Sequence, residues 1–155
     1  MALKLIWIIV IVIIAIAAFW FFLGKTFFPK NVQEVMPKNF NTIKQGNFIE
    51  LDSIHKGEGQ AKFVNADNKY SLLLENFKVT SGPDLYVYLS KENNIDSKDK
   101  LGEFKSLGQL KGNSGNQVYE ITEQDAKDYN SVVIWCRRFN VLFSSASLFK
   151  GNIFI

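Results

Sequence analysis

The chain has 155 residues, of which 47% are hydrophobic and 21% charged, and it contains one cysteine. This length suits one domain, and a single cysteine excludes an intramolecular disulfide. The 18 basic residues include Lys4, Lys25 and Lys30, so the 15 that follow balance the 15 acidic residues, all of which also follow Lys30. No basic cluster there exceeds Arg137-Arg138, which argues against a nucleic-acid surface of the usual kind.

The first predicted element is a transmembrane anchor at residues 5–23, a run of 19 residues without charge or proline. As a helix it would measure roughly 28 Å, close to the hydrocarbon thickness of a bilayer. Ala15-Ile16-Ala17 also has the form of a signal-peptidase site. Because the apolar run continues through residues 19–23, which suit an interfacial aromatic belt, we favour an uncleaved anchor. The flanking lysines then meet membrane lipid.

Residues 24–45 are predicted to form a spacer. They hold two of the three prolines, Pro29 and Pro37, and show no periodicity. We expect a tether that holds a folded domain away from the lipid headgroups. The alternative is an extra edge strand of that domain.

From residue 46 to residue 155, short apolar runs alternate with Gly, Asn, Asp and Ser, a pattern typical of strands and turns. Strands are predicted at residues 48–53, 59–65, 70–79, 84–90, 105–111, 117–121, 132–136, 140–148 and, more weakly, 152–155. Only residues 123–129 suit a helical turn, capped by Thr122 with Asp125 as its partner. We therefore predict an all-β chain, with a single β-sandwich or barrel domain behind the N-terminal transmembrane helix.

Several motifs in this region agree in order and spacing with one known family. They are His55-x-Gly57-x-Gly59-x-Ala61, Leu72-x-Leu74-x-x-Phe77, and the stretches at residues 82–90, 107–121 and 131–148. Together they resemble the DM-thirteen domain family over roughly residues 43–148. Two positions depart from the family pattern in expected turns: Asn68 stands where glycine is usual, and Thr122 where proline is.

The resemblance implies an electron-transfer domain outside the cytoplasm, with the N-terminus inside. Members often stand beside haem-binding domains, and a redox role is proposed for the cysteine that Cys136 matches. We expect its electron partner to be a separate redox protein or a membrane complex.

Considered without the family, Cys136 has two interpretations. Free cysteine is often a buried small hydrophobe, whereas a reactive thiol needs exposure and a nearby cation. On a regular strand Arg138 shares the face of Cys136, about 7 Å away, while Arg137 points to the other face. Arg138 is therefore the candidate thiolate stabiliser, and a β-bulge at residues 136–138 would change this geometry.

Other polar residues give weaker signals. His55, the only histidine, is a candidate cofactor ligand that with Cys136 could suit haem or copper, although a structural hydrogen-bonding role is the more common one. Asp84 is expected to fix a turn. Tyr86, Tyr88 and Tyr119 could form an exposed aromatic face or pack across strands.

Two functions remain, because no hydrolase triad and no nucleotide-binding loop can be assembled. The first is a membrane-anchored extracytoplasmic module that acts in electron transfer through Cys136. The second is a non-enzymatic binding or scaffolding sandwich, in a membrane complex or at the cell surface, in which Cys136 belongs to the core.

Overall fold

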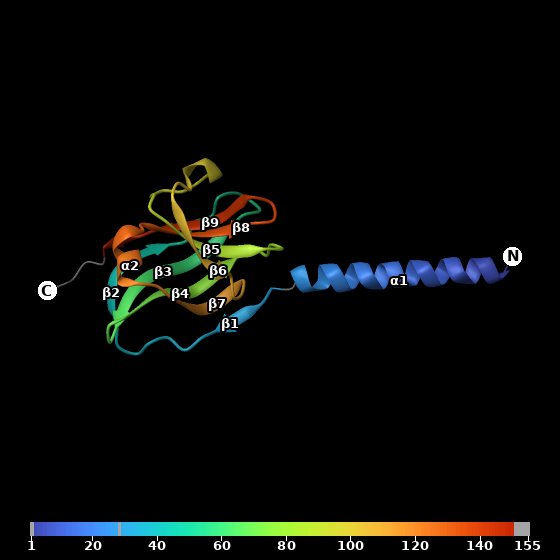
Figure 1. The fold of residues 1–155 in the computed structure, drawn as a ribbon, viewed down its shortest axis with the longest axis horizontal. Coiled ribbons are helices and arrows are strands. Elements are labelled where there is room, and N and C mark those ends of the chain that lie inside the picture. Colours follow the sequence, from blue (N-terminus) through green and yellow to red (C-terminus); the bar gives the residue numbers. More distant parts are fainter. Residues whose placement is uncertain (1, 28, 151–155) are drawn as a thin grey trace.

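The computed structural model describes residues 2–27 and 29–150, with side chains described at residues 4, 6–19 and 29–150. An N-terminal helix, α1 (Ala2–Phe27), leads into two packed β-sheets (Figure 1). One sheet has the order β1-β7-β4-β3-β2-β10, and the other the order β6-β5-β8-β9. The strands are β1 (Asn31–Gln33), β2 (Asn41–Asn47), β3 (Gly57–Ala66), β4 (Lys69–Val79), β5 (Leu85–Ser90), β6 (Phe104–Gln109), β7 (Ser114–Glu120), β8 (Ser131–Cys136), β9 (Val141–Ser147) and β10 (Phe149–Lys150).

The prediction of an all-β sandwich is confirmed, and the two separate sheets decide against a barrel. The strand predicted at residues 48–53 is wrong. After β2 the chain crosses between the sheets: the N–H of Phe48 donates to Gly59 in β3, and that of Ile49 donates to Ser145 in β9. Phe48 is buried as it crosses. The strand predicted at residues 152–155 lies outside the described residues.

The spacer prediction is also corrected. Within residues 24–45, β1 pairs in parallel with β7, and β2 begins at Asn41. Two glycines make room for β1, because a Cβ on Gly112 would meet the carbonyl of Lys30 and one on Gly115 would meet the carbonyl of Val32. The segment therefore contains an extra edge strand, β1, as the alternative to a spacer proposed, and it lies against the domain.

The main hydrophobic core lies between the sheets and contains Phe63, Leu72, Phe77, Ile134 and Cys136. A second cluster, which includes Tyr88, Ile95, Val133 and Trp135, covers the other face of the β6-β5-β8-β9 sheet. Every residue of β8 is therefore buried. Burial on both faces explains why this stretch is continuously apolar in the sequence and does not alternate.

The predicted helical turn is confirmed as α2 (Glu123–Asp128). Thr122 accepts from the backbone N–H of Asp125, and the Asp125 carboxylate accepts from the N–H of Thr122, which completes a capping box. Asn68, where the family usually has glycine, has φ 63° in the turn between β3 and β4. Asparagine tolerates this left-handed conformation better than most residues.

The described side chains of α1, at residues 4 and 6–19, are exposed. In the part of the chain that the structure describes, no helix is long and apolar enough to cross a membrane.

Strand directions define one end of the sandwich, which we call the proximal end. The starts of β1, β3 and β7 lie beside the end of β4. In the other sheet, the starts of β5 and β9 lie beside the ends of β6 and β8. The loops at this end are residues 51–56, 80–84, 110–113 and 137–140. The chain enters the domain from α1 at the same end (Figure 1).

Candidate functional site

Cys136 is the last residue of β8 and lies at the proximal end of the main core. It pairs with Leu85 of β5 on one side and with Val141 of β9 on the other. Its side chain is free of disulfide bonding and 0% exposed. The structure therefore places the thiol inside the protein, without the exposure that thiol reactivity requires.

The proximal loop at residues 80–84 closes the end of the core close to this thiol. A Cβ on Gly82 would come within 2.8 Å of both Leu85 and Phe143. Both of these residues belong to the same core cluster as Cys136. A larger residue at position 82 would require the Leu85 or Phe143 side chain to shift.

The two arginines after Cys136 do not continue the strand, and the alternative of a β-bulge at residues 136–138 does not occur either. Residues 137–140 form a turn, and Val141 begins the return strand. The register irregularity of this hairpin falls between Ile134 and Trp135 instead. The alternation of side chains along the strand ends at Cys136. The prediction that Arg138 lies on the same strand face as Cys136 is therefore wrong.

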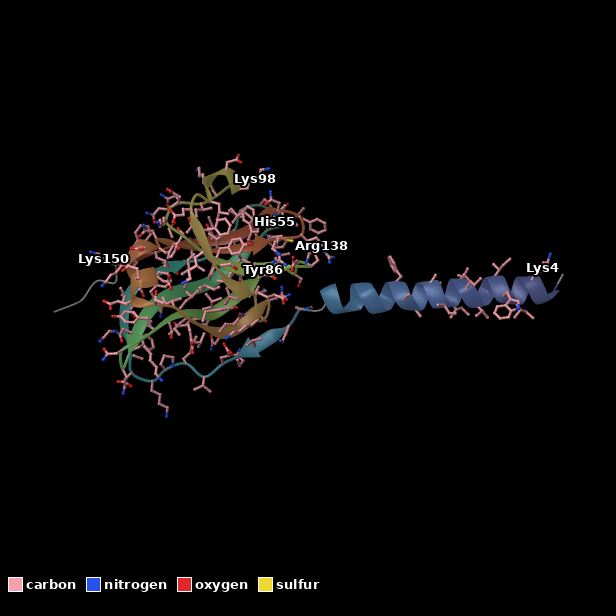
Figure 2. The ribbon with its side chains drawn as sticks, viewed as in Figure 1. Lys4, His55, Tyr86, Lys98, Arg138 and Lys150 are labelled. Carbon is pink, nitrogen blue, oxygen red and sulfur yellow. The ribbon has the colours of Figure 1, made fainter. Side chains whose placement is uncertain are left out.

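Arg137 turns outward against β5. Its Nε lies 3.4 Å from Oδ2 of Asp84, and its guanidinium lies 4.3 Å from the centre of the Tyr86 ring. Arg138 is exposed and has no ion pair with another described residue. Figure 2 shows it at the end of the sandwich that faces α1. The structure therefore gives no contact through which Arg138 would stabilise a Cys136 thiolate.

His55 lies in another proximal loop, where Asp52 holds it. Its Nδ1 lies 2.8 Å from Oδ2 of Asp52, and Oδ1 of the same carboxylate accepts from the backbone N–H groups of Ile54 and His55, each at 2.7 Å. The hydrogen bond from the His55 side chain, with those from the two N–H groups, lowers the pKa of Asp52 to about 2. This is the geometry of a turn fixed by an aspartate side chain.

The His55 ring connects this loop to the core. It packs edge-on against Phe143, with ring centres 4.8 Å apart, and Phe143 belongs to the cluster that contains Cys136. Sequence reasoning missed both partners of His55. The Asp-x-x-His spacing could have indicated Asp52, but Phe143 comes from β9, and no local signal links it to His55.

The described residues give no positive support for a haem or copper centre at Cys136 and His55. No group of three His, Cys, Asp or Glu side chains among them could hold a metal ion. Nδ1 of His55 is engaged by Asp52, and the Cys136 side chain is 0% exposed.

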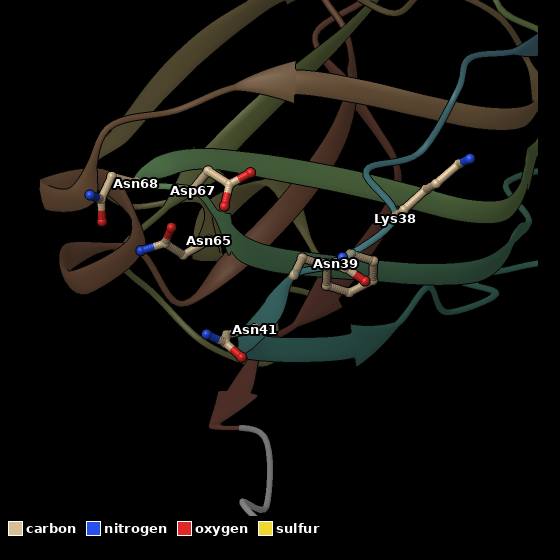
Figure 3. Close-up of a pocket in the computed structure, with 7 residues that line it drawn as sticks. Lys38, Asn39, Asn41, Asn65, Asp67 and Asn68 are labelled. Atoms are coloured by element: carbon tan, nitrogen blue, oxygen red, sulfur yellow. The ribbon is translucent and has the colours of Figure 1, made fainter.

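Two surface hollows lie away from Cys136. The larger, of about 610 Å³, is at the opposite end of the sandwich and is lined by Lys38, Asn39, Phe40, Asn41, Asn65, Asp67 and Asn68 (Figure 3). The other, of about 370 Å³, is lined by residues that include Asn47, Asn94 and Ser147. Neither is lined by Cys136 or His55, so neither supplies a cofactor cavity at these residues.

The tyrosines do not form a common exposed face. Tyr88 and Tyr119 are each 6% exposed and belong to different sheets. Tyr88 stacks on Phe104 at 4.6 Å, whereas the Tyr119 hydroxyl donates to Gln117 at 2.8 Å. Burial raises the pKa of Tyr119 to about 12. The alternative of packing within the sheets is the correct one.

The fold and the proximal end of the core define the class of protein. It is an all-β domain of two sheets, with one buried thiol at the end of a central strand. Residues 47–148 match the model of a family described as Electron transfer DM13. Because this match covers more than half of the chain, the chain belongs to the DM-thirteen family. No curated protein and no solved structure matches the chain.

Proposed function

We propose that the chain is a membrane-anchored electron-transfer domain outside the cytoplasm, and that Cys136 carries its redox change. The observation that supports this most directly is the family match, which spans the sandwich from the end of β2 to Leu148. Cys136 is the one residue in this stretch with two-electron sulfur chemistry that needs no bound group.

The chemistry is thiol–disulfide exchange with a separate redox protein. The Cys136 thiol loses its proton, and the thiolate attacks one sulfur of a disulfide on the partner. A sulfur–sulfur bond to Cys136 forms as the partner's disulfide breaks, and the departing sulfur leaves as a thiolate that takes up a proton. Cys136 is oxidised and the departing sulfur is reduced, so the electrons balance. A second thiol of the partner can reverse the step.

The buried position of Cys136 means that this exchange requires a local opening. Its sulfur lies next to the turn at residues 137–140, and no residue of that turn is buried. Opening the turn and the adjoining end of β9 would expose the thiol while β3, β4 and β7 stay paired. Such limited openings need less free energy than global unfolding.

Anchoring of the chain is supported by residues 5–23 and by α1. The helix carries its described apolar side chains on an exposed surface, for example Trp7, which is 63% exposed, and Phe19, which is 64% exposed. Exposed apolar surface of this extent favours a lipid environment. The lysine pattern is indecisive for orientation, so the extracytoplasmic placement relies on the resemblance to the family.

A redox titration of the purified full chain tests the role of Cys136. In glutathione buffers of graded potential, mass spectrometry should detect reversible formation of a mixed disulfide in the wild type. A Cys136→Ala variant is the matched control and should show none. If the wild type forms no adduct at any potential under native conditions, Cys136 does not carry the function.

Membrane attachment has its own test. The mature chain in the membrane fraction should retain residues 5–23, as shown by its intact mass, and should resist extraction at alkaline pH. In inverted vesicles the domain should be protected from added protease. A mature chain that begins at Ala18 would exclude the anchor.

One observation favours the second candidate, a binding or scaffolding sandwich: the complete burial of Cys136. In that account the cysteine is a small hydrophobe of the core. Cys136→Ala would then leave association with a membrane complex unchanged, and the thiol would react only after unfolding.

A further inference from the structure

The distance between α1 and the folded domain is tightly limited. The domain is fixed from Lys30 onward: the Lys30 carbonyl accepts from Ser114 at 3.3 Å, and its N–H donates to Asn113 at 3.4 Å. Only residues 28 and 29 separate Lys30 from Phe27, the last residue of α1. Three Cα–Cα steps span at most about 11 Å. The domain therefore cannot stand far from the end of the helix.

The helix itself adds little height above a bilayer. If residues 5–23 fill the hydrocarbon layer, residues 24–27 extend α1 by about 6 Å. A headgroup layer is about 5–8 Å deep. The proximal end would then lie next to the headgroups.

The proximal end carries two apolar tips on separate loops. Ile54, in the loop at residues 51–56, is 66% exposed, and Phe139, in the turn at residues 137–140, is 63% exposed. Figure 2 shows their sequence neighbours His55 and Arg138 at the end of the sandwich nearest α1. Single exposed apolar residues are ordinary on protein surfaces. Their shared position beside an apolar helix is what distinguishes these two.

The charges around these tips are mostly paired. Asp84 pairs with Arg137, Asp52 with His55, and Glu50 with Lys56. Arg138, next to Phe139, has no acidic partner among the described residues. A long basic side chain beside an apolar tip can keep its charge at the headgroups while its stem lies along lipid.

We infer that the proximal end docks on the outer leaflet of the bilayer that holds α1, with Ile54 and Phe139 inserted at the headgroup level and Arg138 beside them. This inference depends on the membrane anchor of the proposed function. Docking fixes the domain upright, because β1 ties it to α1 and the two tips support it from separate loops. It also places the turn next to Cys136 at the membrane surface.

The experiment uses the full chain in vesicles of phosphatidylcholine and phosphatidylserine. In a Cys136→Ala background, a polarity-sensitive dye is attached to Arg138→Cys, which keeps both apolar tips. The matched control carries the dye at Lys69→Cys, an exposed position at the opposite end of the sandwich. A further variant combines Arg138→Cys with Ile54→Ser and Phe139→Ser.

Quenching by aqueous iodide separates the outcomes. The inference expects the dye at position 138 to be quenched several-fold less than the dye at position 69, and the two serines to remove this protection. Equal quenching at both positions, or protection that survives the serines, in a chain that floats with the vesicles overturns the docking and leaves the anchor intact. A chain that does not float overturns both.

Discussion

Glu34 and Lys111 join the chain that follows β1 to the loop that precedes β7. Nζ of Lys111 lies 2.9 Å from each carboxylate oxygen of Glu34, and the same carboxylate accepts from the N–H of Val118 at 2.7 Å. Burial raises the pKa of Glu34, but the hydrogen bonds from Lys111 and Val118 outweigh burial and lower it below its ordinary value. This pair holds the segment after α1 on the sandwich.

Replacing Glu34 with glutamine should loosen β1 without unfolding the domain. The change removes the charge from a half-exposed pair, so we expect a loss of about 1–2 kcal/mol in the free energy of unfolding. Hydrogen exchange at the N–H groups of Glu34 and Ser114 should accelerate several-fold more than exchange within β3 and β4. Glu58→Gln, which alters a pair whose charged atoms lie 3.9 Å apart, is the control. Equal acceleration in both variants would show that Glu34 does not hold β1.

Asp125 should make the domain sensitive to acid. Burial raises its pKa, but the hydrogen bonds from Lys105 and from the backbone and side chain of Thr122 dominate, and the pKa lies below the ordinary value of 3.8. The folded pKa is depressed, so the carboxylate stabilises the fold above the unfolded pKa, and this contribution is lost as the pH falls through the folded pKa.

An Asp125→Asn variant measures this dependence. The difference in unfolding free energy between wild type and variant should be constant from about pH 7 to pH 5 and should shrink as the pH falls below about 4. Urea denaturation across this range provides the measurement. A difference that does not change with pH would contradict the assignment.

Lys44 should be essential to the packing of α2 against the sheet. It is 8% exposed, and its Nζ donates to the carbonyls of Lys127 and Tyr129 at 3.0 and 2.8 Å and to the side chain of Asn130 at 3.1 Å. Lys44→Met should lower the free energy of unfolding by about 2–3 kcal/mol, because these acceptors lose a charged donor. Lys69→Met, at an exposed position, should change it by less than about 0.5 kcal/mol. Equal effects in thermal unfolding would contradict this role.

The sequence predicted the elements whose signals are local. Alternation placed β3, β4 and β9 nearly at their observed bounds, and Thr122 with Asp125 identified α2. It did not predict β1, because the three residues Asn31–Gln33 have no pattern of their own. Their pairing depends on Gly112, Gly115 and Lys111, which lie about 80 residues further along the chain.

In the candidate site too, the sequence predicted the features with local signals and missed those that depend on distant residues. The family motif singled out Cys136 and His55, and the structure brings both to the proximal end. The predicted strand at residues 132–136 ends at Cys136 as β8 does, but the sequence did not show that residues 137–140 turn away from the strand, which removes Arg138 from the face of the thiol. It also could not reveal the Phe143 ring that packs against His55. Both facts depend on how distant strands pack.

The stability of core variants provides a control for the proposed redox role. Cys136→Ser places a hydroxyl at a fully buried position and should cost about 1–3 kcal/mol if it finds no acceptor. Cys136→Ala only removes a small apolar volume and should cost less. Denaturant melts of both variants give this order, and the opposite order would show that the sulfur sits among polar groups.

The rate at which native Cys136 reacts with an alkylating reagent, measured at increasing low concentrations of urea, tests the central claim most directly. If the turn at residues 137–140 opens locally, the rate should exceed that of global unfolding and should hardly change with urea, since little surface is exposed. An alkylation rate that equals the rate of global unfolding and rises as steeply with urea would contradict the account, because Cys136 would then be accessible only in the unfolded chain.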